Sequence, residues 1–333
     1  MSVEVLEKYF GIKPEKSLND GRAVRYVVNN SLYTIIPVTH MEQDALIELY
    51  EMSDHMAKYG DKRVSIFVPG IDQKYLVTHK DQDFCLLHNH NFPPSRNNNI
   101  GVKLAKFHER GKALQATITE ANRMGEWKSL WVKRLEQMER VWGGLLREQS
   151  DEEFDRLFIK SFPYYLGLCE NAIQYLTDTE LDEAPHISDR GTICNLHFNN
   201  ELWKSSMEIR NPFDWVFDHP SRDLAEWVRD CYFRNRRSFQ PEVSKFLQGY
   251  ESIAPLSSFS WRLLYARLLF PLHYFTCVED YYITGSQWTK KQLEERLSRY
   301  IRDSKDYEMF LGNFYYIAYV DHKQLPVLDW LRN

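Results

Sequence analysis

The stretch from Gly191 to Val228 limits most strongly what this chain can fold into. It has the pattern of a polar turn, a short strand pair and an amphipathic helix that opens at Ser221. We expect Asn200 at the first strand of the pair and Asp214 at the end of the second. An amide oxygen and a carboxylate are hard ligands, suited to a Mg²⁺ ion that holds the phosphates of a nucleotide. The stretch therefore predicts a hairpin that cradles a divalent metal ion.

The same residues resemble the catalytic loop and metal-binding segment of the aminoglycoside-phosphotransferase-like kinases. The pattern of that family is H-G-D-x-x-x-x-N, a strand, I-D-F/W and then D-P-x-x-D-L-A. The resemblance makes Asn200 and Asp214 the metal ligands and implies that Asp223 hydrogen-bonds the backbone of the catalytic loop. It also implies an α+β fold of the two-lobed protein-kinase type, with Mg-ATP as the cofactor that such a site could hold.

The catalytic Asp of that pattern has no counterpart in this sequence. Counting back from Asn200 places Asn195 at its position, and a loop shorter by two residues would place His197 there. Neither register supplies a carboxylate, because no Asp occurs between Asp189 and Asp214. A carboxamide has no basic lone pair of useful pKa, whereas an imidazole titrates near neutrality. His197 is therefore the alternative base, or else a residue that packs beneath the metal segment.

The strand lysine that holds the α- and β-phosphates in such kinases is missing as well. No lysine occurs between Lys16 and Lys58, the range that contains the third strand of the expected sheet. Arg22 or Arg25 on the neighbouring strand could point inward and substitute for it, or could form the solvent face of an alternating strand. Arg25 is the candidate for a nucleotide contact.

Two further parts of a phosphoryl-transfer site are weak. Only the turn 19–21 lies between the first strands, with one glycine where a phosphate-binding loop has several. A glutamate on the following helix, such as Glu42 or Glu48, has no lysine to hold and is expected at the surface.

The order of the predicted elements is that of a kinase small lobe followed by helices. Residues 1–88 are expected to form an N-lobe, 89–95 a hinge, and 96–333 a helical C-lobe that carries the degenerate catalytic loop and metal segment. In the N-lobe we expect strands 64–68 and 74–79 to pair as a hairpin, among the helices 1–10 and 41–59 and the strands 22–28, 32–38 and 83–88. His88 and His90 lie where the expected hinge begins, with no third ligand nearby, so we do not expect a metal there.

The helix expected at 100–111 contains G-x-x-L-A-x-F-H and closes with Gly111. That motif, with the tryptophan-rich helix 125–146, resembles the bacterial spore-coat kinase-like family of the CotS/YutH type. Pro163 should kink or break the next helix. The remaining expected helices are 152–176, 222–237, 241–250, 258–282 and 290–311.

Composition excludes several other classes of protein. The net charge of −5 argues against a nucleic-acid partner. The longest apolar run, 261–282, contains Arg262, Arg267 and His273, so it predicts a buried helix and not a membrane span. No signal-peptide pattern opens the chain. Five scattered cysteines without C-x-x-C spacing indicate free thiols in a reducing compartment.

The loss of the glycines, the lysine and the base together predicts a pseudokinase. The spore-coat resemblance implies a structural or binding component with other coat proteins as partners, made in the mother-cell cytoplasm and deposited on the spore coat. The alternative is an atypical ATP-dependent phosphotransferase, like the relatives that act on aminoglycosides, choline or homoserine. A nucleotide sensor without turnover stands between the two.

Overall fold

The structure is a computed structural model that describes residues 2–19, 23–39, 41–90, 99–148, 152–203, 208–320 and 325–331. The chain forms two compact units. The first contains residues 1–122, 191–220 and 249–254, and the second contains 123–190, 221–248 and 255–333. The division expected from the sequence, at a hinge in 89–95, stays a prediction.

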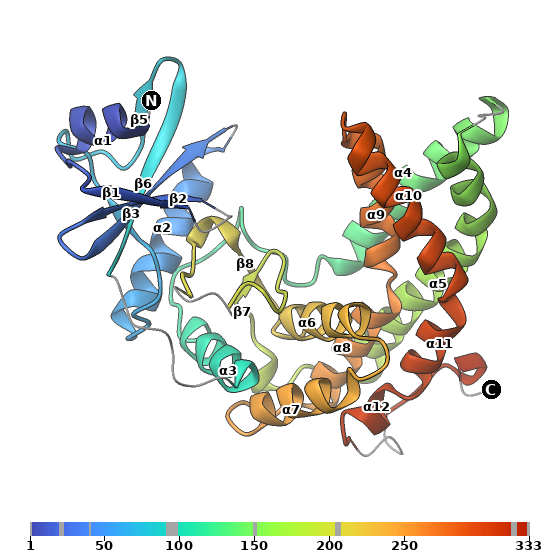
Figure 1. Cartoon of the computed structure of the whole chain (residues 1–333). Coiled ribbons are helices and arrows are strands. Elements are labelled where there is room, and N and C mark those ends of the chain that lie inside the picture. Colours follow the sequence, from blue (N-terminus) through green and yellow to red (C-terminus); the bar gives the residue numbers. More distant parts are fainter. Residues whose placement is uncertain are drawn as a thin grey trace. The chain divides into compact units, whose positions relative to one another are not determined.

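A six-stranded antiparallel sheet dominates the first unit (Figure 1). Its strands run in the order β1-β2-β3-β6-β4, and β5 also pairs with β6. The strands are β1 (Lys16–Asn19), β2 (Val24–Val28), β3 (Ser31–Val38), β4 (Ile66–Val68), β5 (Val77–His79) and β6 (Gln82–His90). Helices α1 (Ser2–Phe10) and α2 (Gln43–Lys58) complete the N-terminal part of the unit.

The two faces of this sheet have different neighbours. On one face, Leu6 of α1 packs with Tyr26 and Leu86 in a buried cluster. Successive side chains of a strand point to opposite faces, so Leu87 belongs to the other face. That second face also carries Phe67, whose ring packs against Tyr50 of α2. The candidate site described below lies on this second face.

The prediction that residues 64–68 and 74–79 pair as a hairpin is wrong. Strands β4 and β5 each pair with β6 instead of with one another. The tight hairpin is β5–β6, where Lys80 and Asp81 have φ values of 50° and 61°. Positive φ at both central residues is the turn that matches the twist of two antiparallel strands. Strand β6 also runs on to His90, into the expected hinge, while residues 91–98 lie outside the described part of the chain.

Helix α3 (Ile100–Gly111) and the strand pair β7 (Thr192–Asn195) and β8 (Trp215–Asp218) complete the first unit. Gly111, expected as a C-terminal cap, serves a different purpose. A Cβ at this position would lie 2.4 Å from Oγ1 of Thr192 and 2.7 Å from the backbone N of Ile193. The glycine is therefore needed because the helix closely approaches β7.

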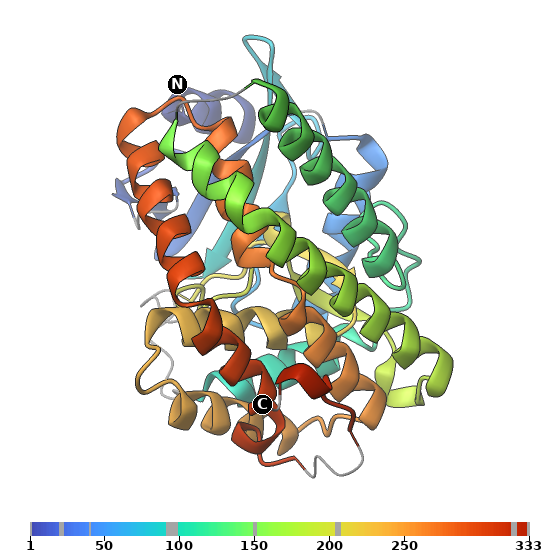
Figure 2. The same cartoon turned by 90° about the vertical axis from the view of Figure 1, so that its right-hand side faces the viewer.

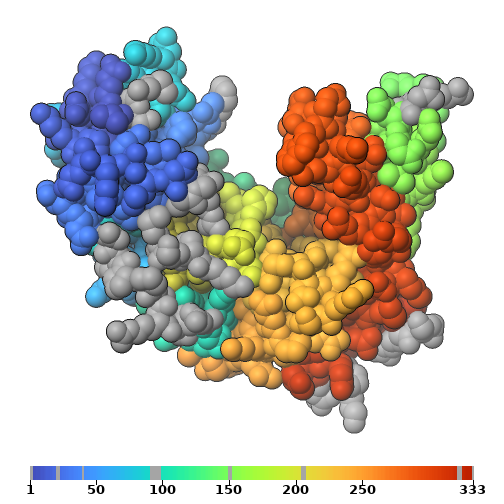
Figure 3. Space-filling model, viewed as in Figure 1, coloured from blue at the N-terminus to red at the C-terminus, as the bar shows by residue number. Residues whose placement is uncertain are grey.

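The second unit is helical, and in Figure 2 the long helix α5 crosses it beside α10. In Figure 3 the orange-red atoms of α10 and the red atoms of α11 adjoin one another at the surface of this unit. The helices are α4 (Trp127–Glu148), α5 (Glu153–Asp182), α6 (Ser221–Arg234), most of α7 (Gln240–Glu251), α8 (Ser258–Leu269), α9 (Leu272–Ile283), α10 (Gln287–Arg302), α11 (Ser304–Gly312) and α12 (Phe314–Ile317). In the described part of the chain, no helix is both long and apolar enough to cross a membrane.

Three helix boundaries differ from those expected. Helix α5 runs through Pro163 without a break. The expected helix 258–282 is two helices, since the chain leaves α8 at Phe270 and begins α9 after Pro271. Proline has no backbone N–H to donate, so Pro271 cannot continue the hydrogen bonding of α8. The expected helix 290–311 also ends at Asp303, which separates α10 from α11.

We expect Gly111→Ala to destabilise the protein by about 1–3 kcal/mol, the usual cost of forcing extra volume into a packed site. Gly144→Ala in α4 is the matched control, because a Cβ there meets no atom within 4 Å. That control should be neutral or stabilising by about 0.4–1 kcal/mol. Urea unfolding of both variants measures the difference, and equal stabilities would contradict the close packing of α3 on β7.

Candidate functional site

The β7–β8 pair brings Asn195 and Asp214 to the same end of a short ladder. Asn195 is the last residue of β7 and lies opposite Trp215. The backbone N–H of Leu196 then donates to the carbonyl of Asp214 over 2.7 Å. Asp214 ends the 3₁₀ turn η2 (Pro212–Asp214) just before β8 begins. The expectation that Asp214 stands at the end of the second strand is therefore wrong, because Asp214 lies just before β8 begins.

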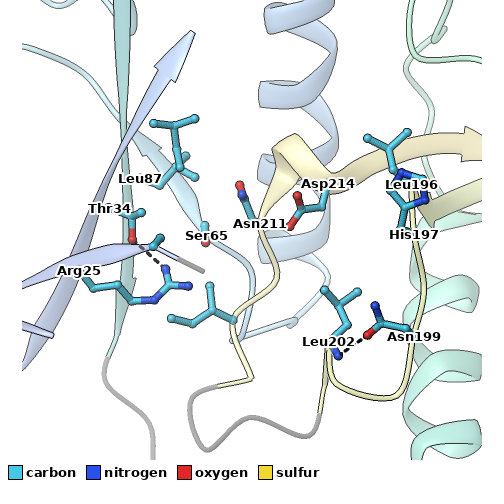
Figure 4. Close-up of a pocket in the computed structure, with 13 residues that line it drawn as sticks. Arg25, Thr34, Ser65, Leu87, Leu196, His197, Asn199, Leu202, Asn211 and Asp214 are labelled. Carbon is cyan, nitrogen blue, oxygen red and sulfur yellow. Dashed lines mark hydrogen bonds between the residues drawn. The ribbon is translucent and has the colours of Figure 1, made fainter. Parts of the chain in front are cut away.

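A cavity of about 480 Å³ opens beside this pair, within the first unit (Figure 4). One wall comes from the sheet and the other from residues 196–202 and 209–214. The lining residues are Ala23, Arg25, Thr34, Ile36, Ser65, Leu87, Leu196, His197, Asn199, Leu202, Ile209, Asn211 and Asp214. The lining is mixed, with six apolar and seven polar or charged residues, and its volume falls in the range of small-molecule sites.

Arg25 lies inward on the sheet wall. It is only 7% exposed. Its Nη1 donates to Oγ1 of Thr34, the residue opposite it on β3, over 2.9 Å. No lysine lines the cavity among the described residues, and Arg22 lies outside them. The sequence left open whether Arg25 points inward or forms the solvent face of its strand, and it points inward. Its contact with a nucleotide stays a prediction.

The predicted metal ligands and bases have different environments. Asp214 and His197 are exposed and line the cavity, so His197 does not pack beneath the metal segment. Asn200 is 1% exposed and lies in a turn after β7 instead of on the strand. Asn195 is 2% exposed, within the ladder.

Two asparagines that line the cavity were not anticipated. Oδ1 of Asn199 accepts the backbone N–H groups of Glu201 and Leu202, each over 3.0 Å. Oδ1 of Asn211 accepts the N–H of Phe213 over 3.2 Å and so caps the turn that carries Asp214. Asx turns of this kind are readable from sequence only once the turn itself is located. Among the described lining residues Asp214 is the single carboxylate. The oxygen ligands that the cavity offers therefore fit a nucleotide-bound Mg²⁺ ion only in part.

Glu48 of α2 is buried, against the expectation of a surface residue. It is 5% exposed. Its carboxylate accepts hydrogen bonds from Oγ1 and the N–H of Thr119 (2.7 Å each) and from the N–H groups of Glu120 and Ala121 (3.0 and 2.9 Å). Burial alone raises the pKa of Glu48, but these hydrogen bonds outweigh it and the pKa lies below its ordinary value. Glu48 lies on the buried face of α2 with Leu49 and Met52. A glutamate at such a position in the sequence indicates a buried carboxylate that needs hydrogen-bond partners.

The segment that Glu48 holds continues to β8. The N–H of Phe217 donates to the carbonyl of Ala121 over 2.8 Å, and Asn122 forms a parallel bridge with Phe217. Helix α2 is thus connected through residues 119–122 to the strand that follows Asp214.

Arg210 connects the two walls of the cavity. Its N–H donates to the carbonyl of Arg63 over 3.0 Å, and its carbonyl accepts the N–H of Ser65 over 2.9 Å. Its guanidinium pairs with the buried carboxylate of Asp61 and lies 4.1 Å from the ring centre of Trp203. This contact holds Ser65 of one wall beside residues 209–211 of the other.

Asp223 is fully buried in the first turn of α6, within the second unit. The carboxylate lies at a helix N-terminus, where the helix dipole favours a negative charge. Its predicted bond to the catalytic loop stays a prediction.

The sheet, the helical part and the β7–β8 pair with its cavity define the aminoglycoside-phosphotransferase-like kinase fold. An aminoglycoside phosphotransferase from Alicyclobacillus acidocaldarius subsp. acidocaldarius is similar with a TM-score of 0.69 at 14% identity, over 93% of this chain and 95% of that one. The amicoumacin kinase hAmiN, solved with AMP-PNP and Ca²⁺, is similar with a TM-score of 0.57 at 13% identity, over 91% and 93% of the two chains.

Sequence comparison defines the family more narrowly. The profile of the family described as "Spore coat putative kinase YutH" matches residues 3–314, and the chain belongs to this family. The endospore coat-associated protein YutH of Bacillus subtilis (strain 168) is 43% identical over 306 residues, which cover 91% of this chain and 89% of that protein.

We expect Glu48→Gln to lower the free energy of unfolding by about 1.5–3 kcal/mol, the range for hydrogen bonds to a charged group. Because the folded pKa of Glu48 is lowered, its contribution is present above the ordinary value of 4.5 and is lost as the pH falls through the folded pKa. The stability difference between wild type and variant should therefore be largest near neutral pH and shrink in acid.

Glu42→Gln is the control for this measurement, since Glu42 is exposed at the N-cap of α2 and its side chain makes no capping bond. Urea unfolding at several pH values measures both variants. An equal effect of the two substitutions, or a difference that grows in acid, would contradict the role assigned to Glu48.

Proposed function

We propose that this protein is a pseudokinase that serves as a structural or binding component of the spore coat. Its membership of the YutH family supports the coat association. We propose other coat proteins as its partners, and synthesis in the mother-cell cytoplasm before deposition on the spore coat. Neither nucleic acid nor membrane is among the proposed partners.

The observation that carries this proposal is the environment of Asn195. The residue at the position of the catalytic Asp is an amide, is 2% exposed and is fixed in the β7–β8 ladder. A carboxamide cannot take the proton of an attacking hydroxyl. Arg25, hydrogen-bonded to Thr34, is the cation on the sheet wall among the described residues. It stands in place of a lysine, which would reach the phosphates as a point charge.

A second candidate is an atypical phosphotransferase. His197, exposed on the cavity wall, favours it, because an imidazole can act as a general base near neutral pH. Asp214, on the cavity wall, would offer one carboxylate to a Mg²⁺ ion held with a nucleotide, while Asn200 would have to supply the second ligand. Metal and nucleotide at this site are proposals.

We expect that Asn195→Asp alone will not produce phosphoryl transfer. Restoring a general base is worth about 10²–10⁴-fold in rate. The missing strand lysine and phosphate loop remove positioning and charge stabilisation that act on the same phosphate. The measurement is ADP release from Mg-ATP with a panel of amine and hydroxyl acceptors.

Asn199→Asp is the matched control, because it adds a carboxylate to the cavity wall away from the position of the base and can keep the Asx turn. ADP release by Asn195→Asp, with none by Asn199→Asp, would show that only the base was missing. The pseudokinase proposal would then fail in its present form.

We also expect little or no thermal stabilisation of the wild type by Mg-ATP. A ligand at 100 times its Kd would add about 2.7 kcal/mol to the native state. A clear shift that needs Mg²⁺ and is lost in Asp214→Asn would instead favour the nucleotide sensor, or the enzyme if ADP is also released.

A further inference from the structure

Two histidines lie together on the sheet face opposite the cavity. His88 and His90 are two residues apart on β6, so both side chains point to the same face. Leu86, two residues earlier, is buried on that face against Leu6 of α1. Leu87 faces the cavity on the other side. The pair is therefore separate from the candidate site described above.

The two imidazoles have the separation of ligands on one metal ion. Their ring centres lie 4.9 Å apart, with an angle of 82° between the planes. A metal–nitrogen bond of about 2.0–2.1 Å puts a ring centre roughly 3.2 Å from the ion. Two such rings at an angle between 90° and 109° have centres about 4.5–5.2 Å apart. The observed separation falls in this range.

The surroundings hold His88 in a state suited to ligation. Tyr33 is its cross-strand partner on β3, and the two ring centres lie 5.0 Å apart. Packing against a ring restricts the imidazole to few rotamers, which lowers the entropy cost of binding an ion.

We propose that His88 and His90 chelate one divalent transition-metal ion on this outer sheet face. Each imidazole supplies one nitrogen, and water completes the coordination. Among the described residues the pair belongs to no group of three or more potential ligands, so the two imidazoles are the ligands that this part of the chain offers. Imidazole suits Zn²⁺, Ni²⁺ and Cu²⁺, and the Irving–Williams order makes Cu²⁺ the tightest of them.

The sequence analysis expected no metal at this pair, because the expected hinge began here as a loop. In a loop, histidines at i and i+2 have no fixed relation. In a strand, they share a face, and the register with β3 fixes their neighbours.

The test is a calorimetric titration of the full chain, without a histidine tag, with Cu²⁺ and with Zn²⁺. We expect one equivalent to bind to the wild type, and this equivalent to be lost in His88→Gln and in His90→Gln. Electron paramagnetic resonance of the Cu²⁺ form should show two nitrogen ligands in the wild type and one or none in each variant.

Two variants serve as controls. Tyr33→Phe keeps the ring beside His88 and removes only the hydroxyl, so binding should persist. His186→Gln removes an exposed histidine whose Nδ1 is hydrogen-bonded to Ser188, and binding should again persist. Because His90 is exposed, His90→Gln carries the test even if His88→Gln unfolds. Binding that is absent in the wild type, or that survives in both histidine variants, would overturn the proposal.

Discussion

The cavity depends on the buried ion pair between Arg210 and Asp61. Arg210 bonds through its backbone to Arg63 and Ser65 and through its side chain to Asp61, so one residue joins segments that are far apart in the sequence. Asp61 also accepts from Arg110 of α3 over 3.3 Å, which fixes that helix to the same point. A buried ion pair of this kind adds little net stability, but removing one partner typically costs about 3–5 kcal/mol. The pair therefore serves to specify where the walls of the cavity meet.

Glu48 connects helix α2 to the segment 119–121 through hydrogen bonds to its carboxylate. In a kinase the helix glutamate holds the strand lysine. Here the carboxylate binds the backbone of residues 119–121, which in turn bonds to Phe217 of β8. The helix, the loop and the strand beside Asp214 are thus held together by hydrogen bonds that involve no nucleotide.

The sequence predicted the parts of this arrangement that depend on local pattern. The alternation of β2 and β3, the apolar stripe of α2 and the β7–β8 pair before α6 were all readable from periodicity. Pairing between distant strands cannot be read from periodicity. For that reason the prediction of a β4–β5 hairpin was wrong, and the strand that holds His88 and His90 on one face was not predicted as far as His90. The inward orientation of Arg25 and the burial of Glu48 depend on Thr34 and on residues 119–121, partners that no local window contains. The coat family was recognised from short motifs, and the comparison with known proteins confirmed it.

The central claim is that this kinase fold does not transfer a phosphoryl group. The most direct test is to follow the γ-phosphate of ATP. The full chain is incubated with γ-labelled ATP and Mg²⁺ or Mn²⁺, with a panel of amines and hydroxylated metabolites, and label is measured on acceptors, on inorganic phosphate and on the protein. We expect no label on any of them above that found with Asp214→Asn, a variant that removes the single carboxylate among the described lining residues. Labelled product that forms with the wild type and disappears in Asp214→Asn would show that the site is catalytic and would contradict the assignment as a pseudokinase.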